Sequence, residues 1–127
     1  MSNDTRKSKR NINKNAKSQN DLLKELVLLR NDPELIDEMM PHAMSGSLDA
    51  QYALGLIFAE GRGTDEDLVK SFAWLSIAVT EGDQDAESLR YIVGERMSSS
   101  QFDESLLLIE KLTQQLATKQ DEKIVIN

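Results

Sequence analysis

The stretch that decides the fold is 50–63, AQYALGLIFAEGRG. Four of its apolar residues fall on one face of a helix, namely Ala50, Leu54, Ile57 and Phe58. Gly61 and Gly63 then supply the positive φ angles that end a helix and turn the chain sharply. The stretch therefore predicts a helix followed by a tight turn.

A second apolar stretch follows this turn at residues 67–79, DLVKSFAWLSIAV. Its small and large apolar residues alternate in the way that two closely packed antiparallel helices require. Gly82 closes this second helix. Together the two stretches predict a helical hairpin, an architecture that offers a surface for another protein and carries no catalytic groups of its own.

The hairpin pattern recurs along the chain with an offset of 36 residues. The offset relates Gly46 to Gly82 and Ala50 to Ala86, and after Met97 the register shifts by two residues. A fixed period of this length is typical of stacked helical hairpins. The sequence therefore predicts an all-α fold over residues 20–117, a short right-handed α-solenoid of about three stacked hairpins.

The residues of this central hairpin also carry a resemblance to a known family. The matching positions are Ala50, Leu54, Gly55, Phe58, Gly61, Gly63, Asp67, Lys70, Trp74, Ala78, Gly82 and Ala86. At this spacing they resemble the Sel-one-like repeat, a relative of the tetratricopeptide repeat, and the segment from Arg90 to Ser105 is similar to the closing helices of short bacterial members. Phe58 departs from the usual Tyr, and Thr64 departs from the usual Val. The resemblance implies structural roles for the matching residues, with Trp74 in the core.

Capping residues predict where the helices begin. The predicted caps are Asn20 or Asp21, Asp32 followed by Pro33, Ser47, Asp83, and the capping box formed by Ser98 with Gln101. The first helix carries Leu22, Leu26 and Leu29, and the second runs to about Met44. The helix after Gly63 is predicted to cover roughly 65–81, and the helix after Ser98 carries an apolar stripe from Phe102 to Leu116. Residues 118–127 are predicted to fray.

Charge is divided unevenly along a chain whose net charge is −7. The basic residues of positions 1–20 are Arg6, Lys7, Lys9, Arg10, Lys14 and Lys17, against Asp4 alone. With Ile12 as their one large apolar residue, residues 1–19 cannot bury enough surface to offset their ordering entropy, so we predict a disordered basic arm. The remaining acidic body favours neutral or basic partners and disfavours duplex DNA.

Groups suited to catalysis, metal binding or cofactor binding are sparse in this sequence. The chain has no cysteine and one histidine, His42, which excludes thiolate and multi-histidine metal sites. The segment 61–63 follows a helix and lacks the further residues of a phosphate loop. No apolar run is long enough to span a bilayer, and the chain opens without a signal core. We therefore expect a cytoplasmic protein that is not an enzyme and has no metal, cofactor or membrane span.

Two functions fit these features. The first is a non-catalytic interaction module, an adaptor or scaffold, whose concave face holds a neutral or basic peptide or helix of a protein partner. The residues assigned to this face, because they alternate with the core residues, are Gln51, Gly55, Ala59, Glu87, Tyr91 and Glu95. The alternative is a tether whose basic arm binds nucleic acid or an anionic surface while the acidic body docks a protein. A homodimer is also open, because so short a stack leaves apolar flanks for a second copy to cover.

Overall fold

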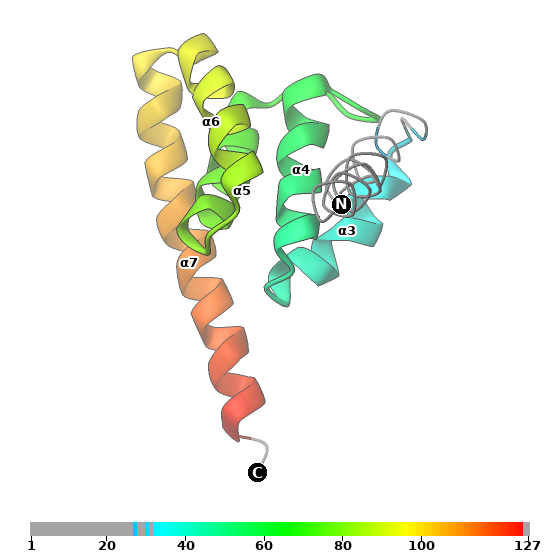
Figure 1. The fold of residues 1–127 in the computed structure, drawn as a ribbon, viewed down its shortest axis with the longest axis vertical. Coiled ribbons are helices and arrows are strands. Elements are labelled where there is room, and N and C mark those ends of the chain that lie inside the picture. Colours follow the sequence, from blue (N-terminus) through cyan, green and yellow to red (C-terminus); the bar gives the residue numbers. More distant parts are fainter. Residues whose placement is uncertain (1–26, 28–29, 31, 126–127) are drawn as a thin grey trace, which may run out of the picture.

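The computed structural model describes Val27, Arg30 and residues 32–125, and this part of the chain forms helices without a strand (Figure 1). The helices are α3 (Glu34–Met44), α4 (Leu48–Glu60), α5 (Leu68–Thr80), α6 (Gln84–Arg96) and α7 (Ser99–Val125). The predicted all-α class is therefore confirmed. The basic arm of residues 1–19 and most of the helix expected from Asn20 or Asp21 lie outside the described residues.

The helices begin at short polar side chains that accept hydrogen bonds from the first turn. Ser47 accepts one from the Ala50 amide at 3.2 Å, and Asp83 accepts one from the Ala86 amide at 3.2 Å. At the start of α7, the Gln101 amide donates to Ser98 and the Ser98 amide donates to the Gln101 side chain, which is the predicted capping box. These predicted caps are confirmed.

The start of α5 differs from the prediction. Asp67 takes the N-cap position and accepts a hydrogen bond from the Lys70 amide at 3.0 Å. Because a cap residue has extended backbone, α5 begins at Leu68 instead of near residue 65. Residues 61–67 therefore form a longer turn between α4 and α5 than we expected.

This longer turn depends on two glycines with positive φ. Gly61 has φ 68° and ends α4, and Gly63 has φ 74°, as the sequence predicted. A β-carbon on Gly63 would overlap the backbone of Asp32 and Pro33. The turn after α4 is thus pressed against the segment that leads into α3, which only a residue without a side chain permits.

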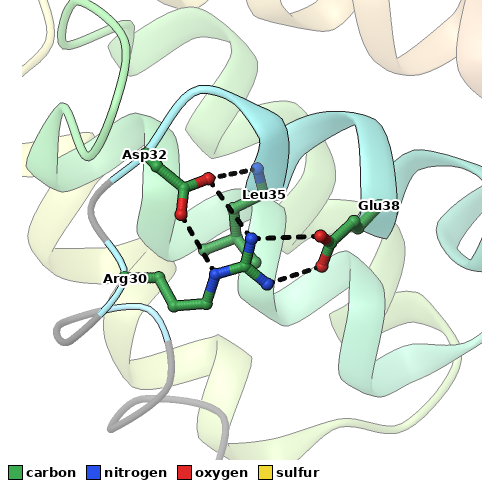
Figure 2. A network of polar contacts seen from close by, with 4 residues as sticks. All are labelled: Arg30, Asp32, Leu35 and Glu38. Carbon is green, nitrogen blue, oxygen red and sulfur yellow. Dashed lines mark hydrogen bonds and ion pairs between the residues drawn. The ribbon is translucent and has the colours of Figure 1, made fainter.

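A surface network holds the start of α3 in place (Figure 2). The Arg30 guanidinium donates to Glu38 at 2.7 Å and to Asp32 at 3.1 Å, while Asp32 accepts the Leu35 amide at 3.0 Å. The hydrogen bond from Arg30 lowers the pKa of the Glu38 carboxyl, and the bonds to Glu38 and Asp32 raise the pKa of Arg30. Asp32 thereby acts as the predicted cap, and Arg30 ties the preceding segment to the surface of α3.

The hairpin of α4 and α5 forms the centre of the molecule, with α3 packed on α4 and both α6 and α7 packed on α5. Leu54, Ile57 and Leu75 have no exposed surface, and Trp74 is 3% exposed, which confirms its predicted core role. Burying one such aliphatic side chain stabilises a fold by about 1.5–3 kcal/mol. The central hairpin is therefore the main source of apolar burial.

The last two helices do not pair as a stacked hairpin requires. α6 and α7 follow each other in sequence but barely contact, because each lies against α5. The buried residues among the described side chains of α7, Ser105 and Leu112, are spaced to share one face of the helix. α7 packs on α5 and also contacts α3. The solenoid arrangement consequently stays a prediction.

The C-terminal helix is longer than the sequence suggested. α7 continues to Val125, and the fraying that we expected for residues 118–127 stays a prediction. In Figure 1 the C-terminal part of α7 extends past the ends of the other helices. The cause is the sequence after Leu116, which contains neither glycine nor proline and has several good helix formers.

Candidate protein-binding groove

The six residues that we assigned to a concave binding face do not lie together on one accessible surface. Gln51 is 1% exposed and Ala59 is 8% exposed, and Gly55 is also buried. Glu87, Tyr91 and Glu95 are exposed on α6. The assignment of Gln51, Gly55 and Ala59 to an accessible face is therefore wrong.

The three residues of α4 have structural roles. The Gln51 side-chain amide donates to the Ala43 carbonyl at 3.1 Å, and the Ser71 hydroxyl donates to the Gly55 carbonyl at 2.7 Å. A β-carbon on Gly55 would overlap the side chain of Leu75. The physical reason is that residues 52–59 of α4 are apolar around the whole circumference of the helix, and a helix of this kind is buried on every side.

The residues that matched the repeat pattern divide according to burial. Ala50, Leu54, Phe58, Trp74, Ala78 and Ala86 are buried, whereas Lys70 and Gly82 are exposed. Gly82 has φ 106° in the turn between α5 and α6. The buried members fill the contacts between α4, α5 and α6, in agreement with structural roles for them.

A groove of about 610 Å³ lies between α6 and α7, with α5 as its floor. We call it the α6–α7 groove; its lining consists of Phe72 and Ser76 on α5, Glu87, Arg90, Tyr91, Gly94 and Glu95 on α6, and Phe102, Leu106 and Ile109 on α7. It exists because α6 and α7 pack on α5 and barely contact each other. The three exposed residues of the predicted face thus belong to this groove.

Phe72 is the centre of the groove floor. Its ring meets the Phe102 ring edge-on with centroids 5.6 Å apart, and the Arg90 guanidinium lies 5.9 Å from the Phe72 centroid. A β-carbon on Gly94 would lie 3.2 Å from the Phe72 ring, so the absence of a side chain there lets α6 approach α5 closely. The ring therefore contacts both walls and joins them across the floor.

The walls of the groove carry unusually exposed apolar side chains. The large hydrophobic residues that are exposed in the described part of the chain all lie on α6 and α7, and they are Tyr91 (69%), Ile92 (56%), Phe102 (43%), Leu106 (48%) and Leu107 (69%). Tyr91, Phe102 and Leu106 line the groove itself. A cluster of exposed apolar groups is a typical sign of an interaction site.

Besides Arg90, the groove contains two carboxylates and a serine hydroxyl group. The carboxylates of Glu87 and Glu95 lie on the α6 wall, on either side of Tyr91. Ser76 is 6% exposed, and its hydroxyl has no hydrogen-bond partner among the described residues. A buried hydroxyl without a partner costs roughly 1–3 kcal/mol. The groove thus combines the apolar phenylalanine ring on its floor, two carboxylates on the α6 wall and the Ser76 hydroxyl, which can still form a hydrogen bond.

Sequence reasoning missed Phe72, Arg90, Phe102 and Leu106 as residues of this groove. Phe102 and Leu106 belong to the apolar stripe predicted for α7, and that stripe carried a usable signal. It runs to Leu116 and is longer than the α5 helix against which it packs. Part of such a stripe must stay uncovered by the chain itself.

None of the helices in the described part of the chain is long and apolar enough to cross a membrane. Within the same part of the chain, no three His, Asp or Glu side chains are grouped in a way that would hold a metal ion.

Comparisons with known proteins show a partial sequence similarity and no matching family or structure. No protein-family model matches the chain, and no solved structure matches it. Over 54 residues the chain is 33% identical to the alginate biosynthesis protein AlgK of Azotobacter vinelandii. The similarity covers 42% of this chain and 12% of AlgK, so the chain corresponds to a small part of that protein. The similarity to Sel-one-like repeats therefore stays a resemblance.

Proposed function

We propose that the protein is a non-catalytic interaction module that binds an amphipathic helix of a protein partner in the α6–α7 groove. The observation that carries the proposal is the concentration of exposed apolar side chains on the two walls, around the floor residue Phe72. Aromatic side chains such as tyrosine are enriched among the few residues that carry most of the binding energy of protein interfaces. Tyr91 is the expected anchor, because its ring brings a large contact area at a small entropic cost.

The shape of the groove favours a helix as the ligand. α6 and α7 both pack on α5, and the α6–α7 groove lies between them. A helix placed in this space contacts both walls and supplies the packing that α6 and α7 do not give each other. Such a ligand presents apolar residues at positions i, i+3, i+4 and i+7.

Charge favours a ligand that is neutral or basic outside its apolar face. Glu87, Tyr91 and Glu95 are spaced by four residues and share one face of α6. Arg90 is directed toward the Phe72 ring, so its charge is engaged at the floor. Lysine or arginine residues that flank the apolar face of the ligand would meet the two carboxylates and speed association. The similarity to AlgK covers too little of either chain to transfer a role in alginate biosynthesis.

A designed peptide tests the proposal directly. The probe is a labelled amphipathic helix with Leu and Phe on one face and Lys on its flanks, and the matched probe replaces each Lys with Glu. Fluorescence anisotropy should show that the basic peptide binds more tightly than the acidic one. Tyr91→Ala should weaken the binding about tenfold or more, which corresponds to about 1.4 kcal/mol for each factor of ten.

Charge reversal gives the second arm of this test. Glu87→Lys combined with Glu95→Lys should weaken binding at low salt and have a smaller effect at high salt, because salt screens exposed charges. The control reverses Glu34 and Asp37 instead, which are exposed on α3. Equal affinity for the two peptides, or unchanged binding by Tyr91→Ala, would contradict the proposal.

Two further measurements separate the proposed function from the tether and from the homodimer that the sequence left open. If the basic arm is the binding element, removing residues 1–19 abolishes binding of nucleic acid or anionic vesicles and the peptide results are negative. If a second copy of the chain fills the groove, sedimentation shows a dimer that Tyr91→Ala dissociates. Either outcome would replace the proposed function.

A further inference from the structure

A second groove of about 750 Å³ lies between α3, α5 and α7. We call it the α3–α7 groove; its lining consists of Ile36, Met40 and Met44 on α3, Phe58 on α4, Thr64, Lys70 and Trp74, and Leu108, Leu112, Gln115, Thr118 and Lys119 on α7. No residue is shared with the α6–α7 groove. The α3–α7 groove is therefore separate from the α6–α7 groove, although both are lined by α5 and α7.

The two grooves differ in charge. The α3–α7 groove is lined by two lysines and by no aspartate or glutamate among the described residues, although the chain has a net charge of −7. The α6–α7 groove contains two glutamates and one arginine. The α3–α7 groove is therefore locally basic on a protein that is acidic as a whole. Its charge favours an acidic ligand.

Both lysines, Lys70 and Lys119, line the α3–α7 groove. The Lys70 ammonium lies 5.4 Å from the Phe58 centroid, near the turn that contains Thr64, and its side chain is 55% exposed. Its distance of 4.0 Å from Asp67 makes only a weak ion pair. Lys119 lies on the last turn of α7 that borders the groove, about 16 Å along the helix from Leu108.

The rest of the groove lining is largely apolar and adaptable. Ile36, Met40 and Met44 are spaced by four residues and form one stripe on α3. Methionine side chains are flexible and polarizable, so they adjust to ligands of different shape. Trp74, which is 3% exposed, is part of this lining.

We infer that the α3–α7 groove docks an acidic segment of a second protein, with apolar residues at its centre and Asp or Glu at its ends. The apolar centre covers the methionines and Trp74, and the acidic ends pair with Lys70 and Lys119. The groove and its ligand are independent of the proposed function. If both hold, the protein is a connector that joins a basic segment on one side to an acidic segment on the other.

The test uses Trp74, the only tryptophan of the chain, as a reporter. The probe is a short peptide without tryptophan, with a Leu-Phe-Leu centre and two aspartates at each end, and the matched probe has lysines in place of the aspartates. Titration of the full chain with the acidic probe should change the Trp74 emission in a saturable way. The lysine probe should produce a much smaller change.

Charge reversal identifies the site. Lys70→Glu and Lys119→Glu should each weaken the acidic probe about three- to tenfold at low salt, because an exposed charge pair acts mainly through association. The matched control is Lys111→Glu, an exposed lysine of α7 outside the groove, which should leave binding unchanged. Circular dichroism should show that all three variants keep the helices.

Several results would overturn the inference. The first is the absence of a saturable signal with the acidic probe, and the second is an equal effect of Lys111→Glu and Lys119→Glu on binding. The third is binding of laurate without binding of the acidic peptide, which would assign the groove to an anionic lipid. Tyr91→Ala should not change this titration, and both designed peptides should bind at once. Failure here therefore differs from failure of the proposed function.

Discussion

Replacing Gly55 with alanine tests the packing of the central hairpin most sharply. Alanine is the better helix former by about 1 kcal/mol, so Gly55→Ala should stabilise α4 if only local propensity mattered. The structure predicts the opposite sign, because the new β-carbon would lie 2.5 Å from Cγ of Leu75. Leu75 has no exposed surface and cannot turn away into solvent.

The magnitude follows from this distance. Carbon atoms pack at about 3.5–4.0 Å, so α4 and α5 must separate by roughly 1 Å or Leu75 must leave its rotamer. Overpacking of this kind costs about 1–3 kcal/mol. After the helix-propensity gain of about 1 kcal/mol is subtracted, Gly55→Ala should lower the free energy of unfolding by up to about 2 kcal/mol. For a domain of this size the melting temperature should fall by up to about 16 °C.

Gly94→Ala is the matched control, because Gly94 is also a glycine inside a helix. Its β-carbon would lie 3.2 Å from the edge of the Phe72 ring, which is half-buried and can tilt. This variant should be neutral or more stable by up to about 1 kcal/mol. Thermal and urea unfolding measure both changes. An increase in stability for Gly55→Ala, equal to that of Gly94→Ala, would refute the close contact.

A double-mutant cycle then identifies the partner. Leu75→Ala alone should cost about 2–5 kcal/mol. Combined with Gly55→Ala it should cost less than the sum of the two single changes, because the clash disappears. Additive effects would show that Gly55 does not act through Leu75.

Three other predictions concern the rest of the chain. Trp74→Ala should cost about 3–5 kcal/mol in urea unfolding, because it truncates a buried aromatic; an unchanged midpoint would mean that Trp74 is not part of the core. Deletion of residues 1–19 should leave helicity and melting temperature almost unchanged, and unfolding of the body would show that the arm packs on it. The pKa of Glu38 is lower in the folded protein, because its carboxylate accepts a hydrogen bond from Arg30. The Arg30–Glu38 contact should therefore stabilise the fold fully at pH values above the ordinary pKa of glutamate, and this stabilisation should be lost as the pH falls through the lower pKa of folded Glu38. Glu38→Gln should reduce the dependence of the melting temperature on acid pH.

The local structure was predictable because its causes lie close together in the sequence. Ser47, Asp83 and the Ser98–Gln101 pair cap helices through bonds to residues two or three positions away. Gly61 and Gly63 turn the chain through their own φ angles. Such features need no knowledge of how the helices pack.

The candidate binding face was predicted only in part, because its accessibility depends on how the helices pack. The alternation that assigned Gln51, Gly55 and Ala59 to an accessible face assumed that α4 has one free side. The run from Tyr52 to Ala59 is apolar all round, and this signal already indicated a helix enclosed by its neighbours, which are α3 and α5. Glu87 and Tyr91 lie on the more polar helix α6, where the same reasoning correctly placed them on the surface.

The separation of α6 from α7 could not be inferred from the repeat pattern. Self-similarity shows that a hairpin recurs, but it does not say which neighbour each helix prefers. The small residue Ser105 and the apolar residue Leu112 let α7 pack closely on α5. That choice opens the groove around Phe72.

The measurement that tests the central claim most directly is site-specific photo-crosslinking in the cells that produce the protein. The photoreactive residue p-benzoylphenylalanine replaces Tyr91 in the α6–α7 groove, and the control carries it in place of Glu34 on α3. The proposed function predicts a discrete crosslinked protein at position 91, with the crosslink on a segment that has apolar residues at helical spacing and Lys or Arg beside them, and no such product at position 34. The same products at both positions, or none at position 91 when the protein is folded and expressed, would contradict it.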